Sequence, residues 1–255
     1  KDKLKFILKN LFTVQNIILY TITFMISMVG ISTDNIMFTI TPFGLAIIAA
    51  ALSCNMPVGI MYLISLISTF IKFGPNSLLT YILTTLVFFV AILIKKPKIQ
   101  DEVNEQKRLG MHLFVSTLLV QVIPMFFRTF ILYELLTSIM LSICTYIFYK
   151  IFSNSITVIR QAGVKKVFSI EEVMGTSLLL AIAFTTLGDT TIFGYNLKNI
   201  LSILLVLILG WKNGILVGAT SGITIGVVLG IICNNEPVMI ASYAISGMIA
   251  GILNR

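Results

Sequence analysis

The chain has 255 residues, of which 57% are hydrophobic and 11% are charged, and its mean hydropathy is +1.02. An ordinary soluble domain carries roughly 25% charged residues, so this composition excludes a water-soluble globule and indicates a membrane protein. The formal net charge is +8, which is typical of basic cytoplasmic loops between membrane helices. Nucleic acid is not an expected partner, because the basic residues are not interleaved with aromatics on a soluble fold.

Nearly uncharged stretches recur along the whole chain, and a helix needs about 20 such residues to cross a hydrocarbon core of about 30 Å. Residues 77–94 are apolar on all sides, whereas the strands of a membrane β-barrel alternate apolar and polar residues. The sequence therefore predicts an all-α fold, a polytopic membrane helical bundle of about ten transmembrane helices. In chain order, the predicted spans lie near residues 13–31, 37–54, 57–73, 77–94, 110–127, 131–149, 171–187, 197–211, 213–233 and 238–253.

The basic residues predict the orientation of this bundle. If the N-terminus is cytoplasmic, every Lys and Arg except Lys72, Arg128 and Lys198 falls in an inner loop or terminus, as the positive-inside rule requires. We therefore expect both termini to be cytoplasmic. The seventh and eighth spans are short and are joined by the polar residues 188–191. A re-entrant pair is the alternative there, and it leaves the C-terminus on the same side.

Two longer polar interruptions, near residues 95–108 and 150–170, are predicted as cytoplasmic loops of a single transmembrane domain covering residues 1–255. The second is basic and moderately apolar, which leaves an interfacial helix open. On a helical projection, however, Arg160 falls among the apolar residues. Ser169 followed by Glu172 has the spacing of a capping box, which predicts the start of the seventh span.

Few polar side chains within the predicted spans are candidates for chemistry. His112 begins the fifth span with no obvious partner, and we interpret it as an interface residue. Glu134 enters the sixth span; an acid within a membrane is a functional candidate, but an interface role is the favoured interpretation. Gln121 is expected to form interhelical hydrogen bonds. We predict no catalytic, cofactor-binding or metal-binding residue and no cofactor for this chain.

The most distinctive pattern is a run of glycines spaced four apart across the ninth span, with a matching small-residue edge on the tenth. Helices in lipid associate through close backbone contact at such small residues, so the pattern predicts a tight hairpin of these two spans. We also expect the chain to form a homo-oligomer. The predicted helix-packing and oligomerisation residues are Gly210, Gly214, Gly218, Gly222, Gly226, Gly230, Gly247 and Gly251.

The N-terminal tail carries the basic residues Lys1, Lys3, Lys5 and Lys9 around an apolar segment. Each basic charge near an anionic leaflet contributes on the order of 1 kcal/mol of attraction. We therefore predict that this tail lies on the membrane surface and that membrane lipid is a partner of the chain.

Four segments together resemble the N-terminal membrane region of the stage II sporulation protein E family. They are ITPFGLAIIAA from Ile40, EEVMGTSLLLAIAF from Glu171, GWKNGILVGATSGITIGVVLG from Gly210, and YAISGMIAGILNR from Tyr243. The resemblance covers most of the chain and is strongest from about Glu171 onward. It implies a multi-pass protein of a bacterial cell membrane, found at the polar sporulation septum.

The resemblance further implies that cytoplasmic regions follow this membrane region in the family. One self-associates and engages the tubulin-like cell-division protein; the next is a manganese-dependent serine phosphatase that dephosphorylates the anti-anti-sigma factor and so activates the forespore sigma factor. No metal-binding aspartate of that phosphatase can be placed in this sequence. We therefore expect a non-catalytic membrane anchor, localisation and assembly domain.

A small-solute transporter or channel is the alternative function. Ten spans, the short seventh and eighth segments, and breaks at Gly and Pro are typical of helices that line cavities. Against this, transporters usually place ionisable groups or unwound backbone near the bilayer midplane, and the predicted spans carry few charges at their centres. A membrane enzyme is less favoured still, because the sequence shows no cluster of metal ligands.

Overall fold

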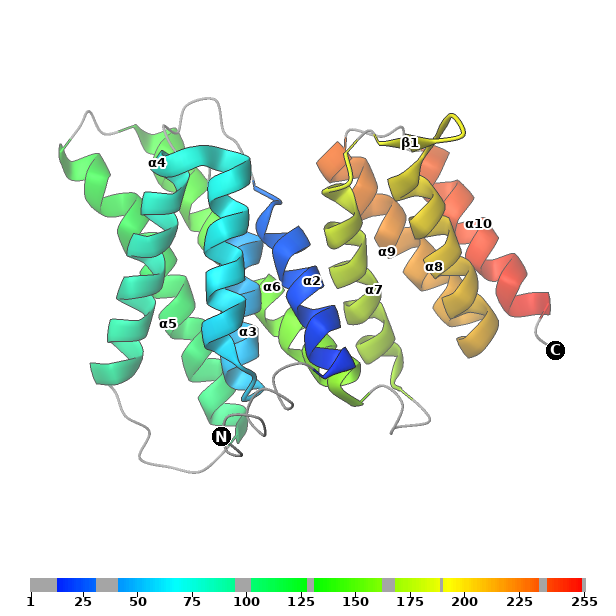
Figure 1. The fold of residues 1–255 in the computed structure, drawn as a ribbon, viewed down its shortest axis with the longest axis horizontal. Coiled ribbons are helices and arrows are strands. Elements are labelled where there is room, and N and C mark those ends of the chain that lie inside the picture. The colour runs from blue at the N-terminus through cyan, green and yellow to red at the C-terminus, as the bar shows by residue number, and fades with distance from the viewer. Residues whose placement is uncertain are drawn as a thin grey trace, which may run out of the picture. The chain divides into compact units, whose positions relative to one another are not determined.

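A computed structural model of the chain describes residues 13–30, 41–94, 102–127, 131–161, 168–188, 190–233 and 238–253. The chain forms two compact units, Lys1–Ser153 and Asn154–Arg255, and each is considered by itself. The described residues are almost entirely helical (Figure 1), which confirms the all-α class.

The helices of the first unit are α2 (Val14–Ser27), α3 (Pro42–Ser53), α4 (Val58–Ile94), α5 (Glu102–Val122), the 3₁₀ helix η1 (Ile123–Phe127) and most of α6 (Leu132–Gln161). The second unit contains α7 (Ile170–Thr185), the strands β1 (Thr191–Ile192) and β2 (Tyr195–Asn196), and then α8 (Leu197–Asn213), α9 (Ile215–Cys233) and α10 (Val238–Leu253).

Three helices in the described ranges are long and apolar enough to cross a membrane: Val58–Ile94, Asn104–Phe127 and Leu132–Gln161. Shorter apolar helices are Val14–Ser27, Pro42–Ser53, Ile215–Gly230 and Val238–Leu253. Their composition agrees with a membrane protein. The count of about ten spans and the cytoplasmic termini stay predictions.

The longest helix, α4, is a helical hairpin. Gly74 interrupts it with φ 79° and ψ −173°, a conformation that favours glycine, and Pro75 follows. This break separates the segments predicted as the third and fourth spans, and Figure 1 shows the two halves side by side. Hydroxyl groups join them, because Tyr62 and Thr85 share a hydrogen bond of 2.9 Å.

Two predicted loop boundaries were wrong. The helix α6 continues through residues 150–161, which were assigned to a loop or to a separate interfacial helix, and α5 begins at Glu102 inside the predicted loop 95–108. The segment after residue 150 is helical because its apolar residues still find burial: Phe152 and Ile156 are both fully buried. Residues 162–167 lie outside the described ranges.

The start of α7 agrees with the predicted capping box. Ser169 Oγ accepts a hydrogen bond from the backbone N–H of Glu172 at 3.2 Å. The carboxylate of Glu172 accepts one from the backbone N–H of Ser169 at 2.8 Å. Two backbone donors at the helix start are thereby satisfied.

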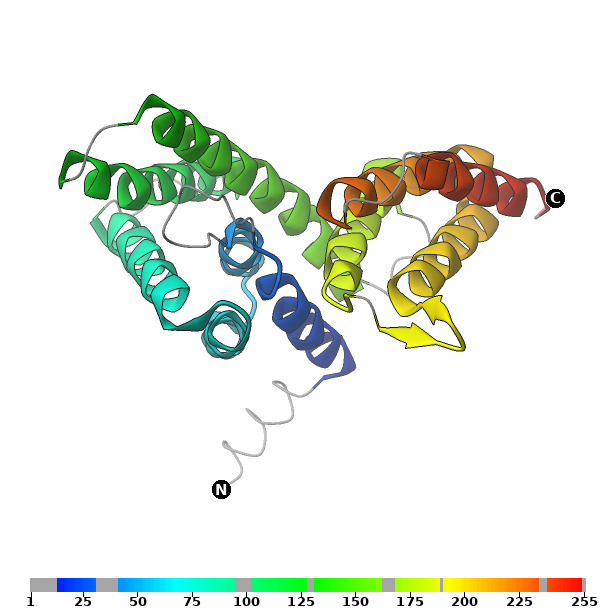
Figure 2. The same ribbon diagram turned by 90° about the horizontal axis from the view of Figure 1, so that it is seen from above.

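A two-stranded hairpin between α7 and α8 was not predicted. Thr191 pairs with Asn196 and Ile192 with Tyr195, so Phe193 and Gly194 form a two-residue turn. Both have positive φ, 53° and 83°, as a type I′ turn requires. Phenylalanine is an unfavourable residue there, because its Cβ crowds the backbone in the left-handed region. Figures 1 and 2 show the hairpin at the start of α8.

We expect Phe193→Asn to stabilise this hairpin by about 1 kcal/mol, because asparagine tolerates positive φ better than phenylalanine. The Phe193 side chain is 97% exposed and loses little packing on replacement. The measurement is amide hydrogen exchange at Leu197, whose N–H donates to the Thr190 carbonyl at 2.9 Å. Exchange should slow about fivefold. Ile192→Asn, at an ordinary strand position, is the control, and equal effects of the two changes would refute the strain at Phe193.

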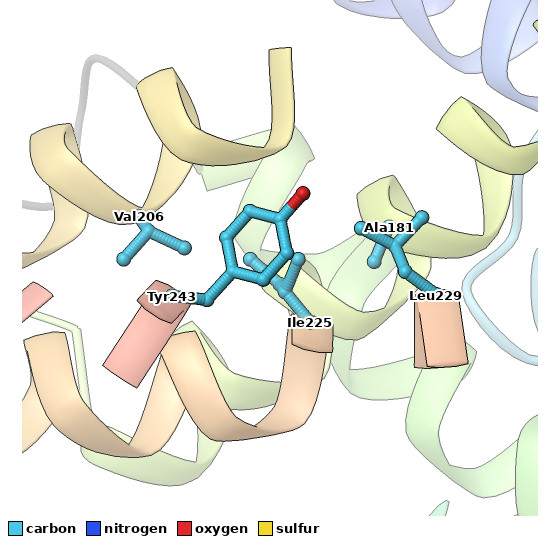
Figure 3. Packing of buried hydrophobic residues seen from close by; sticks show 5 residues of the cluster. All are labelled: Ala181, Val206, Ile225, Leu229 and Tyr243. Atoms are coloured by element: carbon cyan, nitrogen blue, oxygen red, sulfur yellow. The ribbon is translucent and has the colours of Figure 1, made fainter. Parts of the chain in front are cut away.

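A buried core cluster in the second unit is built by residues of α7, α8, α9 and α10. Ala181 of α7, Val206 of α8, Ile225 and Leu229 of α9, and Tyr243 of α10 are buried together, as Figure 3 shows. The cluster combines the small side chain of Ala181 with larger ones, which lets these helices pack closely around the Tyr243 ring.

Candidate functional site

The predicted packing glycines lie where α9 meets α10. A Cβ atom added to Gly218 would overlap the carbonyl oxygen of Gly247, and one added to Gly247 would overlap the carbonyl oxygen of Gly218. The two glycines therefore face each other across the helix pair. Backbone atoms cannot rotate away as a side chain can, so only glycine fits at both positions.

The same contact continues along α9 in steps of four residues. A Cβ at Gly222 would lie 2.8 Å from the Cα of Ala244, and one at Gly226 would lie 2.7 Å from the Cα of Ile240. Later residues of α9 face earlier residues of α10, so the two helices are antiparallel. The glycine stripe is thus a backbone-to-backbone contact over about two helical turns.

The other end of α10 meets α8 and the start of α9. A Cβ at Gly210 would overlap the carbonyl oxygen of Gly247, so Gly247 touches both α8 and α9. A Cβ at Gly251 would lie 2.5 Å from the backbone nitrogen of Ile215 and 2.6 Å from the carbonyl carbon of Gly214. These contacts make a junction of three helices held by glycine.

Gly214 and Gly230 differ from the other predicted glycines. Gly214 ends α8 with φ 88° and ψ −176°, and a Cβ there would meet nothing within 4 Å. Its glycine is required by the turn between α8 and α9 rather than by space for a neighbouring helix. Gly230 lies near the end of α9, and its packing role stays a prediction.

The remaining sequence candidates lie apart from this junction. The basic residues Lys1, Lys3, Lys5 and Lys9 fall outside the described ranges, so their membrane contact stays a prediction. Glu134 lies in the first turn of α6, where a negative charge interacts favourably with the helix dipole.

The expected interhelical hydrogen bond of Gln121 is not formed within the described part of the chain, where its buried side-chain oxygen has no partner. His112, in α5, is half-buried. The described residues also contain no group of three or more His, Cys, Asp or Glu side chains that could hold a metal ion.

Sequence reasoning missed a hydroxyl network that ties α2 to both halves of α4 in the first unit. Ser65 shares hydrogen bonds with Ser27 at 2.8 Å and with the Tyr81 hydroxyl at 2.5 Å. Ser68 donates to the carbonyl oxygen of Phe24 at 2.6 Å. All three serines are fully buried. Such side-chain hydrogen bonds stabilise helix pairs in a membrane, so the network has a structural role.

A second polar contact in the first unit joins the C-terminal end of α3 to α6. The hydroxyls of Ser53 and Ser153 share a hydrogen bond of 3.0 Å, and the thiol of Cys54 donates to the Ser153 carbonyl at 3.5 Å. Cys54 therefore acts as a small packing residue with a weak donor.

Apolar helices joined by glycine contacts and buried hydroxyl pairs define this chain as a helical membrane domain. Over residues 1–255 it matches the family described as SpoIIE, N-terminal domain. The chain belongs to this family, as the resemblance indicated. No curated protein matches it, and no solved structure does either.

Proposed function

We propose that this chain is the membrane anchor, localisation and assembly domain of a sporulation protein serine phosphatase. The observation that carries the proposal is the family match over residues 1–255. The full-length protein would dephosphorylate the anti-anti-sigma factor at the polar septum and thereby activate the forespore sigma factor. Manganese would belong to its phosphatase domain, and its cytoplasmic regions would engage the tubulin-like cell-division protein.

An anchor of this kind needs rigid helices more than it needs reactive groups. The glycine contacts between α9 and α10 support the proposal, because backbone contacts of this kind leave no space for a side chain or a solute between the two helices. A homo-oligomer in the membrane is part of the proposal.

The test is the position of residues 1–255 fused to a fluorescent protein in a sporulating bacterium. We expect the fusion to gather at the polar septum without any phosphatase domain. A Gly218→Leu version is the matched control, since it disrupts the bundle and should lose septal enrichment. An even distribution of the intact fusion over the whole cell membrane would contradict the localisation role.

The transporter alternative is tested separately with purified chain in proteoliposomes. The anchor predicts no saturable flux of any small solute across the vesicle membrane. Saturable uptake that disappears with Gly218→Leu would reject a purely anchoring domain. Phosphatase activity is measured on the full-length protein with manganese and the phosphorylated anti-anti-sigma factor, and residues 1–255 alone should show none.

A further inference from the structure

An open apolar groove runs between the C-terminal ends of α8 and α10 in the second unit. Its walls are Leu207 and Ile208 of α8 and Ile249 and Leu253 of α10, and it encloses about 530 Å³. Ligand sites in proteins typically enclose roughly 300–1,000 Å³ and are lined mainly by apolar side chains. All four wall residues expose between 40% and 65% of their surface, so the groove is open along its length.

Small residues beneath the walls make this groove. Ala250 lines its floor and is 6% exposed. A Cβ added to Gly210 of α8 would lie 3.2 Å from the Cβ of Ala250. The two backbones therefore meet at the floor while the longer side chains stand apart as walls. The glycine contact that joins the helices thus also shapes a hollow on their outer side.

The two remaining lining residues, Trp211 and Lys212, lie in the last turn of α8. Trp211 is 51% exposed, and Lys212 is exposed and is the only charged residue that lines the groove. Tryptophan prefers the boundary between acyl chains and headgroups, and lysine extends its ammonium group toward the headgroups. The groove therefore has an apolar body and one cationic end.

We propose that this groove binds an anionic phospholipid, with an acyl chain along the apolar walls and the phosphate at the ammonium group of Lys212. Charge complementarity favours this occupant. A lipid satisfies the apolar walls and the cation together, whereas an apolar helix of a second copy would cover the walls and leave Lys212 without a counter-charge. The predicted orientation puts Lys212 on the cytoplasmic side, whose leaflet is rich in anionic lipid.

Trp211 is the single tryptophan of the chain, so its fluorescence reports on the surroundings of this one lining residue of the groove. The purified chain is placed in two kinds of vesicle. The first is phosphatidylcholine with a small fraction of brominated phosphatidylglycerol, and the second is phosphatidylglycerol with a small fraction of brominated phosphatidylcholine. Bromine quenches a tryptophan that it touches. We expect the anionic brominated lipid to quench Trp211 at a lower fraction than the zwitterionic one. Lys212→Gln should reduce this preference about fivefold, the effect of one interfacial charge.

Two further variants make the assignment specific. Lys212→Arg keeps the charge and should keep the preference. Lys150→Gln removes another exposed cation, in α6, and should also keep the preference. Equal quenching by the two lipids would mean only nonselective boundary lipid and would overturn the proposal. If neither brominated lipid quenched Trp211, protein would cover the groove, and the proposal would be overturned. If Lys212→Gln left the lipid preference unchanged, Lys212 would not bind the headgroup, and the proposal would also be overturned.

Discussion

Replacing Gly218 with leucine is expected to separate α9 from α10 and to destabilise the chain by about 3 kcal/mol or more. The added side chain begins with a Cβ that would overlap the backbone of Gly247, and overpacking of a well-packed site costs typically 1–3 kcal/mol even when side chains can adjust. Here the obstacle is a carbonyl group in a helix, so the helices themselves must move apart. Thermal unfolding in detergent, followed by circular dichroism, measures the loss.

The matched comparison uses alanine at two helical glycines. Gly218→Ala should lower the unfolding midpoint, since one Cβ is enough to overlap Gly247. Gly59→Ala should leave the midpoint unchanged or raise it slightly, because a Cβ at Gly59 meets nothing within 4 Å and alanine lowers the entropy of the unfolded chain. Gly222→Leu tests the next contact along the stripe. Equal midpoints for Gly218→Ala and Gly59→Ala would count against backbone contact as the basis of packing.

Much of the helix layout was predictable because apolar runs end at polar or helix-breaking residues. The tenth span was predicted at 238–253 and α10 covers Val238–Leu253. The end of α6 was not predictable in this way. Hydropathy indicates which residues can lie in lipid. The backbone hydrogen bonds of a helix form in water as well as in lipid, so a helix can continue beyond its apolar segment.

The hairpin between α7 and α8 was missed for a different reason. Two-residue strands give no period to detect, and type I′ turns are normally recognised by Asn or Gly at the first turn position. Phe193 occupies that position here. The strain at this residue is compatible with the fold because the hairpin is tied at its base, where Leu197 bonds to Thr190.

The glycine stripe could be found from spacing alone, but its partners could not. Which residue of α10 faces Gly222 depends on the register of the pair, and the spacing of the glycines along α9 does not specify that register. The buried network of Ser27, Ser65 and Tyr81 was invisible for a related reason. Serine and threonine are scattered through every predicted span, and only packing decides which of them meet.

The second large effect is expected at Tyr243, whose ring fills the space among Val206 and Ile225 (Figure 3) and is 1% exposed. A membrane helix that separates from the bundle is still surrounded by apolar lipid. Tyr243→Ala therefore costs little in the free energy of transfer from water. The cost is the cavity that remains. At about 24 cal/mol per Å³, a residual cavity of about 100 Å³ destabilises by about 2 kcal/mol.

Tyr243→Phe separates this packing effect from the hydroxyl group. The hydroxyl donates to Asn199 Oδ1 at 3.4 Å, a long contact, and hydrogen bonds between membrane helices average about 0.6 kcal/mol. Phenylalanine should therefore retain most of the stability that alanine loses, as measured by reversible unfolding in mixed detergent micelles. If phenylalanine were as destabilising as alanine, the polar contact would be the main restraint on α10. We favour packing as the main restraint, because the Tyr243 backbone carbonyl lies against Gly222 while its side chain is buried in the core cluster.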